Sequence, residues 1–85
     1  MSKWEKVLDQ ILRGTNDANI SFDDLCGLLT RMGFEKRTKG SHNIFRRDGI
    51  EEMPNLQRDG NKAKPYQVRQ VRNVILKHKL GGKSK

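Results

Sequence analysis

The sequence predicts a single small α+β domain in which an antiparallel three-stranded sheet carries helices packed on one face. Three observations predict this fold. Apolar residues recur with the 3.6-residue period of a helix over residues 3–13, 21–33 and 65–78. Between the second and third of these segments the period changes to two, as in a β-strand. Turn dipeptides then divide the middle part into three short strands, which gives the order α-α-β-β-β-α.

Length and composition limit the chain to one domain with a thin core. A chain of 85 residues buries little more than half of the surface that it exposes when unfolded. Its apolar residues, 33% of the total, fall in periodic blocks, which indicates a foldable chain. No apolar run approaches the roughly 18 residues of a membrane span, and no apolar leader follows Met1. We therefore expect a cytoplasmic protein with no membrane partner.

The first segment, residues 3–13, has the most regular helical pattern. Its apolar residues follow the spacing i, i+3, i+4, i+7, i+8: Trp4, Val7, Leu8, Ile11 and Leu12. Ser2 is a suitable cap for its start, and Gly14 to Asp17 supply residues that end a helix. We expect Trp4 to pack in the core and not to stack on a nucleic-acid base.

A second helix is predicted from Ser21 to Gly33. Ser21 and Asp24 have the spacing of a capping box, and Gly33 can end the helix. Its wide apolar face indicates a core helix and comprises Phe22, Leu25, Cys26, Leu28, Leu29 and Met32. The single cysteine, Cys26, is expected to be a small core residue in a reducing compartment. A nucleophilic Cys–His pair is the less favoured interpretation.

Residues 34–57 are predicted to form the sheet. The expected strands cover residues 34–38, 42–47 and 50–57. The turn from Lys39 to Ser41 joins the first two strands, and Asp48-Gly49 is a hairpin dipeptide that leads to the third. Pro54 lies inside the third strand, which places that strand at an edge or beside a bulge. Residues 58–64 are expected to form a polar, basic loop.

The last helix begins at Pro65, a residue that suits the first position of a helix. Its apolar residues fall on or near one face: Val68, Val71, Val74 and Ile75. His78 lies at its end, where we expect a structural interaction with the helix dipole. Residues 81–85 have no packing side chains and are expected to be a disordered tail. The predicted domain therefore covers residues 1–80, with a core over 21–80 and an additional N-terminal helix over 3–13.

The positive charge is confined to the second part of the chain. Residues 1–33 carry 4 basic and 5 acidic residues, whereas residues 34–85 carry 14 basic and 5 acidic residues, and the net charge is +8. A one-sided field of this kind favours a polyanion: nucleic acid first, then an acidic protein, then a membrane surface. The candidate phosphate contacts are Arg37, Arg46, Arg47, Lys62, Lys64, Arg69 and Arg72.

His42 is the candidate catalytic residue. It follows Lys39-Gly40-Ser41 at the start of a predicted strand. Glycine permits close approach of the backbone to a ligand, and the neighbouring N–H groups can bind a phosphate oxygen. Imidazole titrates near neutral pH and can therefore take or give a proton. The alternative interpretation is an ordinary surface histidine in a turn.

The groups that the sequence lacks narrow the chemistry. No cluster of His, Cys, Asp or Glu has metal-ligand spacing, so we expect no metal and no other cofactor. One histidine among many cations needs a substrate that supplies its own nucleophile, and RNA does so with its 2′-hydroxyl. His42 would deprotonate that hydroxyl, and Lys or Arg would stabilise the charge that develops on the phosphate. DNA lacks this hydroxyl, and we expect it neither to be cut nor to be the partner.

The segment Gly40-Ser41-His42-Asn43-Ile44-Phe45, the Asp48-Gly49 turn, Pro54 and the basic loop before the last helix resemble the HicA family of toxins from bacterial toxin–antitoxin pairs. The resemblance covers about residues 21–80. It implies a fold like that of double-stranded-RNA-binding domains, cleavage of mRNA, and silencing by an acidic-surfaced HicB antitoxin that covers the histidine. On this chain the resemblance implies that His42 is the catalytic residue and that Gly40 and Ser41 shape its turn. It also implies that the basic helix that begins at Pro65 binds RNA.

Two features depart from the family pattern. Many members place a second histidine just after the proline of the third strand, where this chain has Asn55-Leu56-Gln57. The general acid is therefore unassigned, with Lys39 or a water as candidates. The helix over residues 3–13 is additional to the compact core and would either cover one flank or dock on the antitoxin.

Two other functions remain open. A non-enzymatic RNA-binding module of the same fold would need cations but no histidine, because double-stranded RNA is recognised largely by its shape and 2′-hydroxyls. A DNA-binding regulator would use the first two helices as a helix-turn-helix. The negative net charge of residues 1–33 argues against the regulator.

Overall fold

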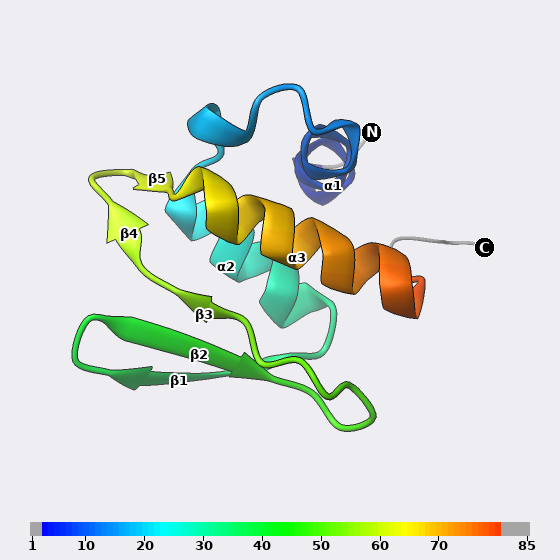
Figure 1. Ribbon diagram of the computed structural model, residues 1–85, viewed down its shortest axis with the longest axis vertical. Coiled ribbons are helices and arrows are strands. Elements are labelled where there is room, and N and C mark those ends of the chain that lie inside the picture. The colour runs from blue at the N-terminus through cyan, green and yellow to red at the C-terminus, as the bar shows by residue number, and fades with distance from the viewer. Residues whose placement is uncertain (1–2, 81–85) are drawn as a thin grey trace.

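The computed structural model describes residues 3–80 and confirms the predicted α+β architecture (Figure 1). The elements are α1 (Lys3–Arg13), the 3₁₀ helix η1 (Asp17–Asn19), α2 (Phe22–Arg31), β1 (Glu35–Lys39), β2 (His42–Arg46), β3 (Asn55–Leu56), β4 (Arg58–Asp59), β5 (Lys62–Ala63) and α3 (Pro65–His78). The proposed cap at Ser2 and the predicted tail over residues 81–85 lie outside the described residues.

The molecule has three layers. The sheet β1-β2-β3 forms the first layer, α2 and α3 cover one of its faces, and α1 packs on those two helices from the side away from the sheet (Figure 1). Both strand pairs of the sheet are antiparallel. Phe45 and Leu56 are fully buried and point toward the helices, so the neighbouring positions on β2, His42, Ile44 and Arg46, lie on the opposite, outer face.

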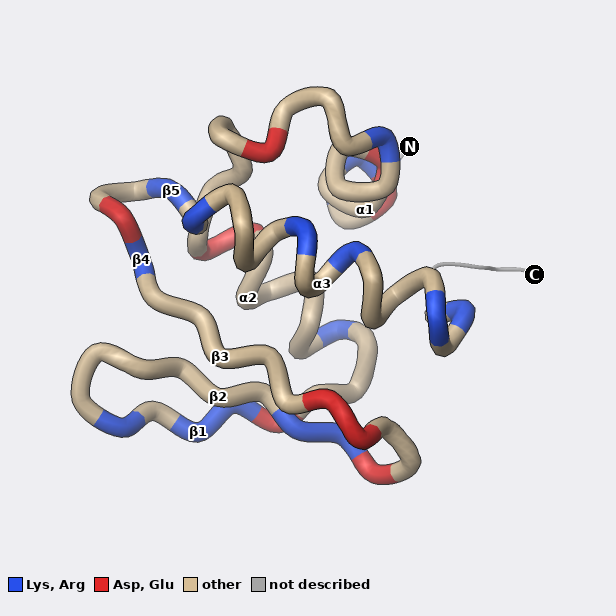
Figure 2. The backbone as a smooth tube through the Cα atoms, viewed as in Figure 1, with Lys and Arg blue, Asp and Glu red and all other residues tan. Residues whose placement is uncertain are grey.

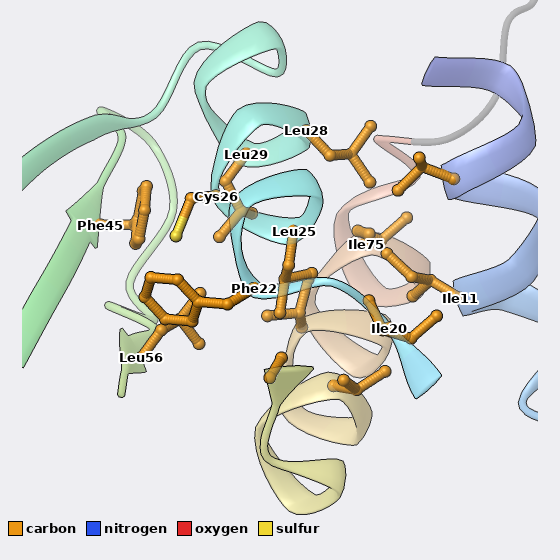
Figure 3. Close-up of a cluster of buried hydrophobic side chains, with 14 of the residues drawn as sticks. Ile11, Ile20, Phe22, Leu25, Cys26, Leu28, Leu29, Phe45, Leu56 and Ile75 are labelled. Atoms are coloured by element: carbon orange, nitrogen blue, oxygen red, sulfur yellow. The ribbon is translucent and has the colours of Figure 1, made fainter. Parts of the chain in front are cut away.

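The core is built from the helix faces that the sequence predicted. Ile11, Leu25, Leu29, Phe45 and Ile75 are almost completely buried and lie in one cluster between the layers (Figure 3). Each fully buried side chain of this size contributes about 1.5–3 kcal/mol relative to an exposed one. The N-cap role predicted for Ser21 is also confirmed, because its hydroxyl accepts a hydrogen bond from the Asp24 N–H at 3.3 Å, while the Asp24 carboxylate lies 3.1 Å from Lys3 Nζ.

Trp4 packs against the core as predicted, and Gly27 makes this packing possible. A Cβ atom at Gly27 would lie 2.4 Å from the indole ring. Glycine inside a helix costs about 0.5–1 kcal/mol relative to alanine. At Gly27 this cost is offset by the close contact between α1 and α2.

A partly buried ion pair fastens the segment after α1 to α3. The Arg72 guanidinium lies 3.0 Å from an Asp17 carboxylate oxygen, and the two side chains are only 17% and 14% exposed. The same guanidinium donates to the carbonyl of Ile11 at 3.2 Å. One side chain of α3 therefore holds both the end of α1 and the start of η1.

The predicted third strand over residues 50–57 is wrong in length. Only Asn55–Leu56 pairs with β2, and the preceding residues form a turn and an extended loop. Pro54 cannot donate to a ladder, although its carbonyl accepts from the Phe45 N–H at 2.8 Å. Glu52 lies in this loop, where its carboxylate binds Lys77 and His78 at the C-terminal end of α3.

The predicted loop over residues 58–64 is in fact a short hairpin of β4 and β5. Gly60 and Asn61 form its two-residue turn, and Gly60 has a φ of +63°. The Ala63 N–H donates to the Ile20 carbonyl at 2.9 Å, and the Phe22 N–H donates to the Asn61 carbonyl at 3.0 Å. The hairpin therefore joins the start of α2 to the start of α3.

Candidate functional site

The turn before His42 is a tight two-residue connection. Lys39 and His42 are partners in the register of β1 and β2, so only Gly40 and Ser41 lie between the strands. Gly40 has a φ of +61°, whereas Ser41 does not have a positive φ. Glycine at the first of two central positions is the pattern of a type II′ hairpin turn, whose twist matches that of the strands. This local geometry fixes His42 as the first residue of β2.

His42 is exposed at this end of the hairpin and is held by amide side chains. Its Nδ1 lies 3.2 Å from Asn55 Oδ1. When Nδ1 carries the proton, it donates to this oxygen and leaves Nε2 as the free acceptor. Gln57 Nε2 lies 3.5 Å from each ring nitrogen and 3.4 Å from Ser41 Oγ. These long distances show that the amide lies against the ring without a strong bond to either nitrogen.

Residues at the start of α3 hold Asn55 and Gln57 in place. Lys64 Nζ donates to Gln57 Oε1 at 3.2 Å. Gln67 is the buried polar residue of the described chain, at 2% exposure. Its Oε1 accepts from the Gln57 backbone N–H at 3.0 Å, and its Nε2 donates to the Asn55 carbonyl at 3.1 Å. The residues that contact His42 are therefore held by Lys64, the N-cap residue of α3, and by Gln67 in the first turn of that helix.

Three cations share the outer face of the sheet with His42. Residues opposite each other in an antiparallel pair point to the same side. Lys39 stands opposite His42, Arg37 opposite Ile44, and Arg46 opposite Glu35. Figure 2 shows Lys and Arg along this hairpin, with acidic residues gathered in the loop beyond β2. The face is thus cationic from the turn to Arg37 and mixed at the far end, where Asp48 lies 3.8 Å from the Arg46 guanidinium.

A hollow of about 470 Å³ adjoins the turn. Its lining comes from the turn, the inner side of the hairpin, β4 and the start of α3: Thr38, Gly40, Ser41, Asn43, Gln57, Arg58 and Lys64. Arg58 is fixed there by a 2.9 Å ion pair with Asp23 and by the Phe22 ring 4.6 Å below its guanidinium. The hollow thus gathers two cations, two hydroxyls and two amides next to the turn that precedes His42, a donor set suited to a phosphate and its sugar.

The predicted phosphate contacts do not all gather at this site. Lys64 and Arg37 lie near His42 as described above. Arg46 and Arg47 lie at or beyond the other end of β2, about 13 Å away for a strand of this length. Lys62 is exposed on β5 and Arg69 on α3. Arg72 is occupied by its ion pair with Asp17, so its side chain serves the fold.

The second histidine has a structural role, with a different partner from the one that the sequence suggested. His78 Nε2 lies 2.8 Å from Glu52 Oε1, and Lys77 Nζ lies 2.8 Å from Glu52 Oε2. The hydrogen bonds from Lys77 and then from His78 lower the pKa of Glu52 to about 2. The bond to Glu52 in turn raises the pKa of Lys77.

Cys26 is buried in the core, as expected. Burial raises the pKa of its thiol to about 11, with Lys36 opposing that rise. A thiol of this kind is not ionised near neutral pH and is a poor nucleophile. The geometry therefore argues against a Cys–His pair.

Two features are absent from residues 3–80: a cluster of metal ligands and a helix that could span a membrane. No group of three or more His, Cys, Asp or Glu side chains in this range is placed to hold a metal ion. No helix in the same range combines the length and the apolar character needed to cross a membrane.

Four residues of the site around the turn are not predicted from the sequence: Asn55, Gln57, Arg58 and Gln67. Asn55 and Gln57 occupy the segment in which a second histidine was expected from the family pattern. Asn55 and Gln57 flank the buried Leu56, so a correct assignment of β3 would have indicated that they border His42. Gln67 gave no local signal, because its partners are backbone groups of a distant segment.

Comparison with protein-family models matches residues 22–79 to the model for the HicA toxin of bacterial toxin–antitoxin pairs. The match covers more than half of the chain, from the first residue of α2 to the residue after α3, and leaves α1 and η1 outside. Comparisons with curated proteins and with solved structures gave no match.

Proposed function

The chain belongs to the HicA family of toxins from bacterial toxin–antitoxin pairs, and on that basis we propose that it is an endoribonuclease that cleaves mRNA with His42 as the catalytic residue. The proposal includes a reaction that needs no metal ion, because RNA supplies the nucleophile. It also places the reaction in the cytoplasm, where mRNA is translated.

The proposed reaction begins with transfer of the 2′-hydroxyl proton to Nε2 of His42. The 2′-oxygen attacks the adjacent phosphorus, a P–O2′ bond forms, and the P–O5′ bond breaks. The departing 5′-oxygen takes a proton from water or from Lys39, whose position is opposite His42 on the sheet. The products are a 2′,3′-cyclic phosphate and a 5′-hydroxyl. Nearby Lys and Arg side chains stabilise the charge on the phosphate oxygens.

One observation carries the proposal: an exposed imidazole is oriented by Asn55 at a tight turn, with cations on the same face. The contact to Asn55 Oδ1 favours the tautomer with Nε2 unprotonated, which is the form that can accept the hydroxyl proton.

The test is cleavage of RNA by the purified chain in the presence of EDTA. We expect fragments with 2′,3′-cyclic phosphate ends from the wild type and none from His42→Ala, and growth arrest on expression of the wild type alone. Cleavage that survives His42→Ala would remove His42 from the mechanism. RNA binding of equal strength by both proteins, with no cleavage by either, would favour a non-enzymatic RNA-binding module.

The toxin family implies a cognate antitoxin partner. We propose an acidic-surfaced HicB-type protein that covers His42 and the cations of the outer sheet face. Mixing the toxin with such a protein is expected to abolish cleavage, and Arg37→Glu is expected to weaken the complex through like-charge repulsion.

A further inference from the structure

We propose that Gln57 is a second catalytic residue, which donates a hydrogen bond to a non-bridging oxygen of the phosphate under attack, and that Lys64 and Gln67 are its positioning residues. This inference rests on the proposed ribonuclease function. It assigns a transition-state donor to a site for which the sequence analysis named only one catalytic side chain.

The orientation of the Gln57 amide is fixed by chemistry. An ammonium group can only donate, so the amide atom 3.2 Å from Lys64 Nζ must be the oxygen. The NH₂ group therefore points the other way, toward Ser41 and the imidazole. Its contacts there are long, at 3.4 Å to Ser41 Oγ and 3.5 Å to each nitrogen of His42, so its hydrogens are only weakly used.

The position of this NH₂ group fits the geometry of the reaction. In the transition state the 2′-oxygen and the non-bridging oxygens are bonded to one phosphorus. The group that removes the 2′ proton and a group that binds a non-bridging oxygen must therefore be neighbours. Gln57 Nε2 lies 3.5 Å from each ring nitrogen of His42, and Gln57 also lines the hollow next to the turn. Gln57 keeps both of its protons throughout, because it donates a hydrogen bond and transfers nothing.

The backbone of Gln57 is fixed as well as its side chain, because its N–H donates to Gln67 Oε1 at 3.0 Å. Gln67 is 2% exposed and uses both ends of its amide on β3, accepting from the Gln57 N–H and donating to the Asn55 carbonyl. Both bonded groups flank Leu56, which is fully buried. A buried amide that is fully used in this way fixes the segment that carries the two side chains nearest to His42.

The first experiment compares Gln57→Met with the wild type in single-turnover cleavage of a ribo-oligonucleotide in EDTA. Loss of one transition-state donor is expected to lower the rate about 100-fold while the KM changes much less. Gln10→Met, at an exposed glutamine on α1, is the matched control and should cleave like the wild type. Both variants should melt within a few degrees of the wild type, because Gln57 is only partly buried.

A phosphorothioate at the cleavage site separates a catalytic role from a structural one. Replacing the contacted non-bridging oxygen by sulfur should slow the wild type and add little to the defect of Gln57→Met. Equal slowing of both proteins by each sulfur isomer would show that Gln57 does not touch these oxygens. Wild-type rates in Gln57→Met would overturn the inference and leave His42 in place, whereas absence of cleavage by the wild type would overturn the function as well.

The positioning roles are tested in pairs. Lys64→Met is expected to lower the rate about tenfold by releasing the amide, and to lower it no further in the Gln57→Met background. Equal losses in both backgrounds would show that Lys64 acts on RNA directly and does not aim Gln57. Gln67→Met should speed hydrogen exchange of the Gln57 backbone N–H and reduce the rate. Unchanged exchange and rate would exclude Gln67 from the positioning role.

Discussion

The two ends of α3 each bring a histidine into a polar cluster, and the clusters differ in charge and in tightness. At the C-terminal end, His78 and Lys77 share the carboxylate of Glu52, with both contacts at 2.8 Å. The His78 side chain is only 22% exposed. This cluster pins the loop between β2 and β3 to the helix.

At the N-terminal end, His42 has only amide partners among its described contacts. Asn55 Oδ1 is 3.2 Å away and Gln57 Nε2 is 3.5 Å away, and both residues are supported by Gln67. The ring is exposed. These neutral partners orient the imidazole and leave it open to solvent.

The difference separates a stabilising histidine from a reactive one. At His78 the ring nitrogen is occupied by a 2.8 Å contact with a carboxylate and the side chain is mostly buried. An amide partner orients the ring while leaving one nitrogen free to gain and lose a proton. The tight, charged cluster around His78 is thus suited to stabilising the fold, and the open, neutral cluster around His42 is suited to proton transfer.

The largest expected effect is the difference in RNA cleavage between two variants, His42→Ala and His78→Ala. His42→Ala should lower RNA cleavage by at least about 100-fold, the usual contribution of a general base, and change the melting temperature little. His78→Ala should retain cleavage and melt at a lower temperature. The two assays are initial cleavage rate and thermal unfolding, and reversed outcomes for the two variants would invert the comparison.

The next effect concerns the support of the neutral cluster. Gln67→Met leaves the Gln57 N–H and the Asn55 carbonyl without their buried partner, and each such group costs about 1–3 kcal/mol. Urea unfolding should show this loss in the free energy of unfolding. Gln70→Met, at an exposed position of the same helix, should change it by less than about 0.5 kcal/mol. Similar values for the two variants would mean that the buried amide adds nothing.

A smaller effect is expected from the pH dependence of the charged cluster. The pKa of Glu52 is about 2 in the fold, below its ordinary value of 4.5, because Lys77 and His78 bind the ionised form. Its stabilisation is therefore complete above about pH 4.5 and is lost as the pH falls toward 2. Glu52→Gln should lower the urea midpoint near neutral pH, and the gap to the wild type should close in acid. A gap that stays constant down to the acid end would contradict the ion-pair account.

The smallest effect should appear in the salt dependence of RNA binding. In the His42→Ala background, where RNA is not cut, Arg37→Gln or Lys39→Gln should each reduce the slope of log Kd against log salt by about 0.7 for single-stranded RNA. Lys77→Gln, in the other cluster, should leave the slope unchanged. Equal changes for all three variants would mean that RNA does not distinguish the two ends of the molecule.

Much of the fold could be predicted because its signals are local. The stripe from Trp4 to Leu12 and the cap at Ser21 depend on neighbours within a turn or two. The third strand is shorter than predicted, and the loop before it contains Glu52, whose partner Lys77 lies 25 residues away and outside any short window. The β4-β5 hairpin did have a local signal in Gly60-Asn61, a dipeptide typical of two-residue turns.

In the candidate site, too, the features with local sequence signals could be predicted and those that depend on distant partners could not. The turn before His42 follows from the glycine and the change of period, which are adjacent in the chain. Gln67 could not be predicted, because a glutamine beside valines in a helix gives no sign that distant backbone groups will satisfy its amide. Arg72 has the same helical environment as Arg69 in the sequence, but its partner Asp17 lies 55 residues away.

The layered arrangement has a practical consequence. α1 is separated from the outer face of the sheet by α2 and α3 (Figure 1). A fluorophore or a surface tether attached to an exposed side chain of α1, such as Lys6, would therefore not crowd His42. Single-molecule and immobilised binding measurements can be built from that end of the chain.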